Sequence, residues 1–351
     1  MQRILFVCLA LANGGAERVV SVLSDSLLNN GNEIYILPLT NREQTYQVDK
    51  RIHLLKRDNE RHGVVDKILR IKSIYKAIRK YNITTVIAFS HYNAMYSVVA
   101  ARGLNVKVIG SERNDPAQVG NRKALNWLRM RLYKNLDALV CQTNDAKAYF
   151  PEDIQKKSVV ILNPITDSLP APYQGERKHR VVSFSRLEPQ KNIPMLLEAF
   201  EMFQKSHPDY VLDIYGMGSL RDELIEKTKN NSTIRIQQYT TDIHNAILDA
   251  SMFCLSSDYE GMSNSMIEAM GCGIPTIVTD CPCGGARMVI RDGVNGIIVP
   301  VRDSMKMAEA MCKVADDKEL AQKLSREGLK IRDTLDKRKI SEQWEAVING
   351  Q

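Results

Sequence analysis

The sequence has no run of about 18 uninterrupted apolar residues, the length that a transmembrane helix needs. Its opening apolar segment, residues 4–8, is too short for a signal peptide and enters a glycine loop without a cleavage pattern, which favours a buried strand. The seven cysteines are scattered and odd in number, as expected for free thiols rather than a disulfide framework. We therefore expect a cytoplasmic protein, which can still sit peripherally on the cytoplasmic face of a membrane.

Patterns that bind metal ions are also missing. No Asp-x-Asp occurs, and the six histidines include no pair spaced i, i+4. Cys272, Cys281 and Cys283 follow a C-x8-C-x-C spacing, unlike the paired C-x2-4-C of zinc sites. We expect no metal and no cofactor, and we read residues 281–286 as a loop that opens a helix, where two glycines allow close approach.

Length and charge indicate two domains with different surroundings. A chain of 351 residues is too long for one ordinary core, since domains hold roughly 100–200 residues. Residues 1–165 hold 25 Lys and Arg against 14 Asp and Glu, a net charge of +11, whereas residues 166–351 have a net charge of −4. This split indicates different partners for the two halves, and a solvated basic surface explains it about equally well. We expect no nucleic acid among those partners.

Short apolar segments alternate with helical patterns along the whole chain. Several expected strands are apolar at consecutive positions, which is typical of strands buried on both faces in a parallel sheet. The expected strands are residues 4–9, 33–37, 85–89, 107–110, 138–141, 158–162, 181–184, 211–215, 233–237, 252–255, 276–279 and 296–299. The expected helices are residues 16–29, 64–80, 92–102, 121–135, 144–149, 193–205, 219–229, 242–250, 264–271 and 304–315.

A stretch rich in proline and polar residues interrupts this alternation. We assign residues 1–165 to a first domain, 166–178 to a linker, 179–335 to a second domain and 336–351 to a C-terminal helix. The expected fold is α/β, with two doubly wound, Rossmann-like domains facing each other across a cleft. Ligands of such sheets bind beyond the carboxyl ends of the strands, so chemistry is expected on the loops that follow strands.

The loop after the first strand contains Gly14, Gly15 and Glu17. The glycines let the backbone approach a ligand, and the following helix offers N–H groups to an anion. The loop is not the G-x-G-x-x-G pattern, so a nicotinamide cofactor is not indicated. A tight turn without a ligand is the other interpretation.

The loop after the first strand of the second domain holds Arg186 and Lys191. A nucleotide diphosphate gains negative charge as it leaves a sugar, and two cations can stabilise that charge in place of a metal. The other interpretation is a solvated basic loop.

Residues 257–269 contain two glutamates, Glu260 and Glu268, in an E-x7-E spacing. Gly261 and the polar residues after it indicate a loop that feeds a helix beginning near Asn264, with Glu260 in the loop and Glu268 one turn into the helix. Carboxylates accept hydrogen bonds from sugar hydroxyls. The backbone N–H groups at the helix start can meet a phosphate; they belong to Met262, Ser263, Asn264 and Ser265. An exposed acidic helix end is the alternative.

Taken in order, these segments resemble glycosyltransferase family 4, the retaining transferases of the GT-B fold. Arg186 and Lys191 match the pair that binds the donor diphosphate in that family. Glu260 is similar to the family's glutamate near the donor sugar, and Glu268 to its glutamate on the ribose. The resemblance implies metal-independent transfer with retention at the anomeric carbon, by front-face attack.

Further segments extend the resemblance over nearly the whole chain. Residues 14–17 look like the family's N-terminal glycine loop, where we expect Gly15 to bind the donor and Gly14 and Glu17 to lie near the acceptor or the sugar. Gly216 and Gly218 look like its glycine turn beside the nucleotide. Residues 269–275 and 292–296 are also family-like. The resemblance implies that the second domain binds a nucleotide sugar, the first binds the acceptor, and the last helix, about residues 339–348, returns to the first domain.

Within the family the chain is most similar to bacterial polysaccharide enzymes, including those that extend polyprenyl-diphosphate-linked glycans. We expect a UDP-linked hexose or N-acetylhexosamine as donor, with GDP-mannose second, and a saccharide acceptor carried on a lipid. Arg113 stands where many members have a histidine near the donor sugar. Because arginine does not deprotonate at neutral pH, we assign no protein base. His91, after the strand at 85–89, lies near the expected cleft, although a packing or surface role fits it better.

Two other functions fit the same segments. A non-catalytic subunit that binds a nucleotide sugar or glycan would be expected to have lost the donor loops, which are intact here. A GT-B-like sugar epimerase would form product without an acceptor.

Two basic, amphipathic segments stand out in the first half, residues 64–81 and 121–134. Such helices can lie on anionic lipid or hold a lipid diphosphate, and they can equally be ordinary helices packed on a sheet with their cations in water. The second segment holds Arg122, Lys123, Arg129 and Arg131 around Trp127, Leu128 and Leu132. The basic first half favours contact with the inner leaflet of a membrane.

Overall fold

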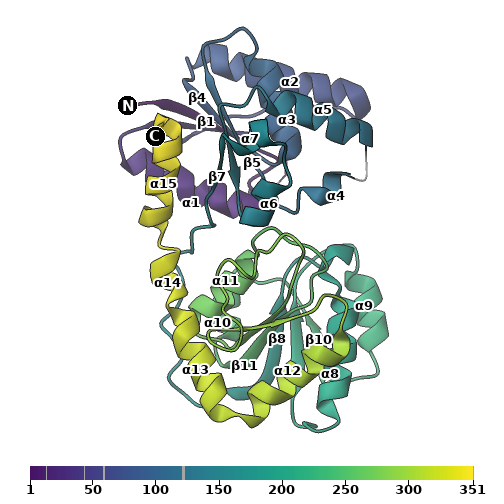
Figure 1. Cartoon of the computed structure of the whole chain (residues 1–351). Helices are drawn as coiled ribbons and strands as arrows, with labels where there is room; N and C mark the ends of the chain where they lie inside the picture. The colour runs from purple at the N-terminus through teal and green to yellow at the C-terminus, as the bar shows by residue number, and fades with distance from the viewer. Residues whose placement is uncertain (13, 43, 58–59, 121–122, 351) are drawn as a thin grey trace. The chain divides into compact units, whose positions relative to one another are not determined.

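The computed structural model describes residues 1–12, 14–42, 44–57, 60–120 and 123–350 (Figure 1). The chain divides into two units, unit 1 of Met1–Pro164 with Leu335–Gln351 and unit 2 of Ile165–Thr334. Each division falls one residue before a boundary placed from the sequence, at 165/166 and 335/336.

Unit 1 contains a parallel sheet in the order β3-β2-β1-β4-β5-β6-β7. Its central strands β1 and β4 are apolar at consecutive positions and, apart from the partly exposed Arg3, buried, because helices cover both faces of the sheet. The strands are β1 Arg3–Cys8, β2 Glu33–Pro38, β3 His53–Leu54, β4 Thr85–Phe89, β5 Lys107–Ser111, β6 Ala138–Cys141 and β7 Ser158–Val160. β3 was not expected, since it has two residues and both are exposed.

Eight helices of the described part of unit 1 surround this sheet. They are α1 Gly15–Asn29, α2 Gly63–Lys80, α3 His91–Ala101, α4 Ala117–Gly120, α5 Lys123–Tyr133, α6 Asn144–Ala148, α7 Glu152–Gln155 and α15 Lys337–Asn349. Residues 121 and 122, expected at the start of a helix, lie outside the described residues. The C-terminal helix α15 packs against α1, and both are visible side by side in Figure 1.

Unit 2 contains a second parallel sheet, in the order β10-β9-β8-β11-β12-β13. Its strands are β8 Lys178–Phe184, β9 Val211–Tyr215, β10 Ile234–Gln237, β11 Ala250–Leu255, β12 Thr276–Thr279 and β13 Ile297–Val299. Because β8 begins at Lys178, the expected linker 166–178 ends one residue too late. The helices are η1 Pro189–Lys191, α8 Ile193–Gln204, α9 Arg221–Thr228, α10 Ile243–Ile247, α11 Asn264–Gly271, α12 Ser304–Asp316, α13 Lys318–Leu329 and α14 Ile331–Thr334.

The expectation that residues 281–286 open a helix is wrong. Residues 282–283 and 285–289 form turns, and the N–H groups of Val289 and Ile290 both donate to the carbonyl of Ala286. Gly284 has φ of 74°, in the left-handed region, and a Cβ on Gly285 would lie 1.7 Å from the carbonyl oxygen of Gly261. The two glycines therefore serve a sharp turn and a close backbone contact, which a helix does not allow.

Each sheet reverses its strand order at one point. In unit 1 the reversal lies between β1 and β4, and in unit 2 it lies between β8 and β11. Successive connections leave on opposite sides of such a point, so the loops after its two strands flank an open crevice at the carboxyl edge. The residues that follow β8 and β11 are therefore the first place to look for a site in unit 2.

Candidate active site

Lys191 and Glu260 meet at the reversal point of unit 2. Lys191 ends η1, which follows β8, and Glu260 lies in the loop that follows β11. The ammonium of Lys191 donates a hydrogen bond to Oε1 of Glu260, and the two side chains are 8% and 14% exposed. The two residues, which sequence analysis selected for separate reasons, are therefore partners in one ion pair.

Two further side chains hold this pair, and sequence reasoning missed both. Ser257 donates its hydroxyl to Oε1 of Glu260 over 2.9 Å. Gln190 donates its amide to Oε2 of Glu260 over 3.3 Å and to the carbonyl of Tyr259 over 2.7 Å. Both carboxylate oxygens thus have donors, and the orientation of the carboxylate is fixed.

The backbones of the two loops are also joined. The N–H of Asp258 donates to the carbonyl of Gln190 over 2.9 Å, and the Ser256 hydroxyl donates to the carbonyl of Lys191 over 2.8 Å. Asn192 has φ of 42°, in the left-handed region, and donates its amide to Asp258 over 2.9 Å. A non-glycine residue held there is strained, so the surrounding contacts must fix this turn.

Arg186 differs from Lys191 because its side chain is exposed. Its Nη2 donates a long hydrogen bond of 3.4 Å to the side-chain oxygen of Gln190. The loop therefore offers one cation to solvent and holds the other against a carboxylate.

Glu268 lies inside α11 and is buried. Oε2 of Glu268 is 2.8 Å from Nε2 of His244, which α10 supplies. An ionised carboxylate only accepts, so the imidazole donates its N–H. His244 carried no sequence signal, because it stands alone in a short polar segment without a motif.

The helix that carries Glu268 begins at Asn264, as predicted, and Glu260 lies in the loop before it. Ser263 is the N-cap residue, and its hydroxyl is 2.9 Å from that of Ser265. Met262 and Ser263 are buried, and Asn264 and Ser265 are partly exposed. The positive end of the α11 dipole therefore lies four residues from the Lys191–Glu260 pair.

Gly216 and Gly218 pack against the loop that carries Arg186. A Cβ on Gly216 would lie 2.0 Å from the carbonyl oxygen of Ser185, and one on Gly218 would lie 2.3 Å from that of Leu187. These contacts require glycine whether or not a nucleotide binds, so a role of the two residues in donor binding stays a prediction.

In unit 1, three of the four residues expected near the acceptor or the sugar, Gly14, Glu17 and His91, flank the reversal between β1 and β4, together with Gly15, which was expected to bind the donor. Gly14 and Gly15 follow β1, and the carboxylate of Glu17 folds back so closely that a Cβ on Gly14 would lie 1.9 Å from it. His91 opens α3 directly after β4. Burial, helped by the charge of Arg129, lowers the pKa of His91 to about 4, so its imidazole is neutral at pH 7.

Arg113 lies among aromatic rings of unit 1. Its guanidinium is 4.6 Å from the ring centroid of Phe89 and 5.5 Å from that of Trp344 on α15, and it donates to Asn163 over 2.8 Å. Burial lowers the pKa of Arg113 to about 9, which still leaves it charged at pH 7. Through these contacts Arg113 holds α15 against the sheet.

The interpretation of residues 121–134 as one basic surface is wrong for Arg129. Its side chain is fully buried, 3.8 Å from Glu112, and it donates to the carbonyl of Pro116 over 3.0 Å. Arg122 lies outside the described residues, whereas Lys123, Trp127 and Arg131 are exposed.

The described residues contain no cluster of three or more His, Cys, Asp or Glu that could hold a metal ion, and no helix among them is long and apolar enough to span a bilayer. All seven cysteines are free thiols.

Two family models match the chain. Residues 13–169 match the one described as Glycosyltransferase Family 4, and residues 169–331 match the one described as Glycosyl transferases group 1. Together they cover nearly the whole chain and meet close to the boundary between the two units.

Two curated relatives are similar over nearly the full length, and a third over about 70% of it. An α-1,4-N-acetylgalactosaminyltransferase of Campylobacter jejuni, named for a diphosphoundecaprenol-linked substrate, is 24% identical over 99% of this chain and 98% of its own. An uncharacterized glycosyltransferase of Haemophilus influenzae is 22% identical over 99% of this chain and 100% of its own. A UDP-Gal:α-D-GlcNAc-diphosphoundecaprenol α-1,3-galactosyltransferase of Escherichia coli is 25% identical over 71% of this chain and 70% of its own.

Solved structures share the fold. Anabaena HepE in complex with UDP-glucose superposes with a TM-score of 0.82 at 14% identity, covering 100% of both chains. A mutant of S. aureus TarM in complex with fondaparinux, α-GlcNAc-glycerol and UDP gives 0.82 at 14% identity, covering 99% of this chain and 100% of that one. The family resemblance drawn from the motifs is confirmed, and the chain belongs to the family 4 glycosyltransferases of the GT-B fold.

Proposed function

We propose that the protein transfers a sugar, with retention, from a nucleotide-diphosphate sugar to a saccharide carried on a lipid diphosphate. The donor is a UDP-linked hexose or N-acetylhexosamine, and the reaction belongs to the assembly of a bacterial surface polysaccharide or glycan. Relatives from C. jejuni and E. coli are named for undecaprenyl-diphosphate-linked acceptors, and similar structures hold UDP. Seven free thiols favour a reducing compartment such as the cytoplasm.

The observation that carries the proposal is the Lys191–Glu260 pair beside the exposed Arg186. An ammonium has three N–H donors, and the bond to Glu260 uses one. The other two can donate to phosphate oxygens while Glu260 stays in place, and the Arg186 guanidinium can approach the same diphosphate from solvent. Both cations then stabilise the charge that develops as the glycosidic bond breaks.

Glu260 has a second role in this proposal. Its carboxylate is oriented by hydrogen bonds from Lys191, Ser257 and Gln190. A carboxylate has about four acceptor positions, so it can also accept a hydroxyl of the donor sugar. A fixed acceptor loses little entropy when the sugar binds, and this favours a defined pose for front-face attack.

Glu268 is the proposed ribose-binding residue. Oε2 of Glu268 is held by His244, and a carboxylate has about four acceptor positions, so Glu268 can also accept a ribose hydroxyl. The ion pair at one loop and this carboxylate on α11 would then hold the diphosphate and the ribose of the nucleotide sugar.

The two cations supply the positive charge that a divalent ion supplies in other transferases, and we propose that none is needed. We assign no protein base, since Arg113 is engaged with aromatic rings and charged at neutral pH.

The test is transfer by the purified protein. A thermal-shift screen across UDP- and GDP-sugars selects the donor, and a short polyprenyl-diphosphate disaccharide then serves as acceptor. We expect a product with the anomeric configuration of the donor, read by NMR. An inverted product, or no transfer from any donor that binds, contradicts the proposal, and sugar conversion without acceptor indicates an epimerase.

A further inference from the structure

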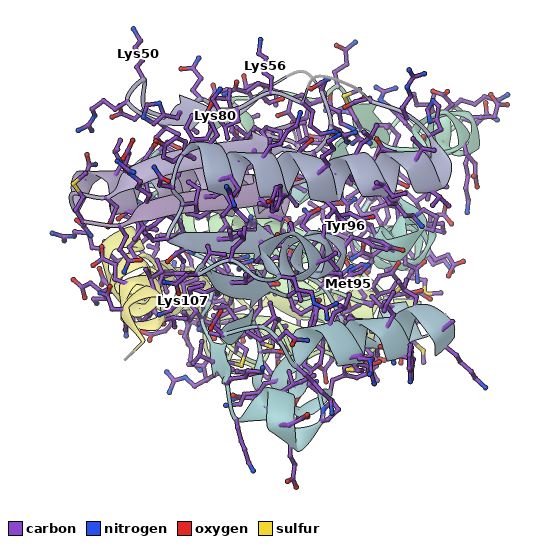
Figure 2. All side chains as sticks on the ribbon, turned by 90° about the horizontal axis from the view of Figure 1, so that it is seen from above. Lys50, Lys56, Lys80, Met95, Tyr96 and Lys107 are labelled. Atoms are coloured by element: carbon purple, nitrogen blue, oxygen red, sulfur yellow. The ribbon has the colours of Figure 1, made fainter. Side chains whose placement is uncertain are left out.

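The lysine of the candidate site occupies an unusual position for its residue type. Lys50 and Lys56 of unit 1 show the ordinary position, because their side chains extend from the ribbon into solvent (Figure 2). Lysine is almost never fully buried unless it is paired. The side chain of Lys191 is only 8% exposed, so contacts within unit 2 must decide where its ammonium lies.

The backbone directly after Lys191 is fixed by the side chain of Asn192. Asn192 has φ of 42°, and its amide donates to Oδ1 of Asp258 over 2.9 Å. Its side-chain oxygen accepts a hydrogen bond from the N–H of Met195 and so caps α8. Both ends of the Asn192 side chain are therefore engaged, and a change in the Asn192 turn would move Lys191 with it.

A third loop reaches the same carboxylate. Arg302 lies between β13 and α12 and donates to Oδ2 of Asp258, from Nε over 3.1 Å and from Nη2 over 2.9 Å. Two donors on one planar guanidinium fix the direction of the contact as well as its length. The two oxygens of Asp258 thus divide their donors, with Asn192 on one and Arg302 on the other. We call Arg302, Asp258 and Asn192 the loop clamp.

The backbone of Arg302 is strained. Its φ is 60°, in a region that glycine adopts freely and arginine rarely does. Four non-glycine residues in the described part of the chain have positive φ, and two of them, Asn192 and Arg302, are the two ends of the loop clamp. Such strain gathers at functional sites, where the surrounding contacts over-determine the backbone. A glycine would meet the needs of the backbone at 302, so the contribution of arginine lies in its side chain.

We propose that Arg302 is a positioning residue for Lys191 that acts through Asp258 and Asn192. The guanidinium fixes the carboxylate, the carboxylate fixes the Asn192 turn, and the turn places the Lys191 ammonium where a leaving diphosphate meets it. The inference rests on the proposed function, since it needs Lys191 to bind that diphosphate. The side chain of Arg302 is 73% exposed, and an exposed ion pair contributes little to stability, so positioning is the effect to measure.

Arg302→Gly separates positioning from a contribution to folding. Glycine accepts φ of 60° without strain, so the melting temperature should not fall. The kcat should fall by roughly tenfold, because Lys191 is displaced from the reacting atoms. Arg302→Lys keeps the charge without the two-pronged donor and should recover part of the rate. The matched control is Lys306→Ala, which removes an exposed cation of α12 that pairs with Glu309 over 2.7 Å and should keep the wild-type rate.

A double-mutant cycle tests whether Arg302 acts through Lys191. If it does, Arg302→Gly should have little further effect on the Lys191→Ala enzyme, since the side chain that it places is already gone. The affinity for UDP, measured by calorimetry, gives a second readout that needs no sugar transfer. Arg302→Gly should raise the Kd for UDP by roughly threefold or more, whereas Lys306→Ala should leave it unchanged.

The inference is overturned by any of three results. A wild-type rate and UDP affinity for Arg302→Gly would remove the role of the side chain. Equal losses from Arg302→Gly in the wild-type and Lys191→Ala backgrounds would show that Arg302 acts elsewhere. A melting temperature that falls together with the rate would assign Arg302 to the fold alone. A wild-type protein that binds UDP and transfers no sugar would contradict the proposed function, while the UDP measurements would still test Arg302.

Discussion

The ammonium of Lys191 and the carboxylate of Glu260, 69 residues apart in the sequence, form a nearly buried ion pair at the reversal point of the second sheet. Contacts within the chain hold the pair, because Ser257 and Gln190 also donate to the Glu260 carboxylate. Removing one partner leaves the other charge buried and poorly compensated, which is costly for both the fold and the reaction.

Lys191→Ala should lower kcat by roughly 30- to 1000-fold, since loss of one donor to a developing anion costs on the order of 2–4 kcal/mol of barrier. It should also lower the melting temperature, because Glu260 loses its countercharge. Arg186→Ala should lower kcat as well but leave the melting temperature unchanged, since Arg186 is exposed. Steady-state kinetics and thermal unfolding of both variants separate the two effects. A Lys191→Ala enzyme with the wild-type rate would contradict the assignment.

His244→Ala should raise KM for the nucleotide sugar by roughly tenfold and leave kcat nearly unchanged. A hydrogen bond to a charged group contributes about 1.5–3 kcal/mol, and Glu268 would lose its orientation without His244. His244→Gln, whose amide can still donate, should recover part of the affinity.

Donors with a deoxyribose make the role of His244 specific. If Glu268 binds the ribose, removal of the contacted hydroxyl should weaken the wild-type enzyme and have little further effect on His244→Ala. An equal loss for both proteins would show that His244 acts elsewhere.

Asp66 should make the protein more stable above pH 4 than below it. Burial raises the pKa of Asp66, but hydrogen bonds from Arg57, the Arg61 N–H and Arg70 outweigh burial and lower the pKa to about 2. A folded pKa below the unfolded value gives stability that is complete above the unfolded pKa, 3.8, and is lost as the pH falls toward 2. Urea unfolding from pH 7 to pH 3 should show this loss, and Asp66→Asn should remove that part of the pH dependence. An unchanged acid limb in Asp66→Asn would contradict it.

Gly216→Ala should destabilise unit 2 by about 1–3 kcal/mol, because its methyl group would meet the carbonyl oxygen of Ser185 and push the Arg186 loop. Gly328→Ala is a suitable control, since it lies inside α13 and its Cβ would meet ordinary contacts at 3.4 Å or more. The control should be neutral or slightly stabilising. Chemical denaturation of both variants tests the difference.

Much of the fold could be predicted from the sequence because strands buried on both faces are apolar at consecutive positions. β4 was predicted to the residue on this basis, and β9 was predicted to the residue although Asp213 stands in its middle. β3 was not predicted because its two residues are exposed. α13 was not predicted because its apolar residues are sparse among charged ones and it packs against α11 and α12.

The site could be predicted only as separate motifs. Spacing placed Lys191 and Glu260 on two loops, but only the strand order shows that these loops adjoin. Gln190, Ser257 and His244 could not be found, since single polar residues gain a role only from the neighbours that folding gives them. Arg129 was misassigned for the converse reason, because a basic residue in an amphipathic segment looks exposed until Glu112 is found beside it.

The central claim is that two side chains, and no divalent ion, stabilise the leaving diphosphate. The most direct measurement is the initial rate of sugar transfer by the wild-type protein with excess chelator, then with added Mg²⁺ or Mn²⁺. The account predicts the same rate in all three conditions. Activity that disappears with chelator and returns with the metal would contradict it.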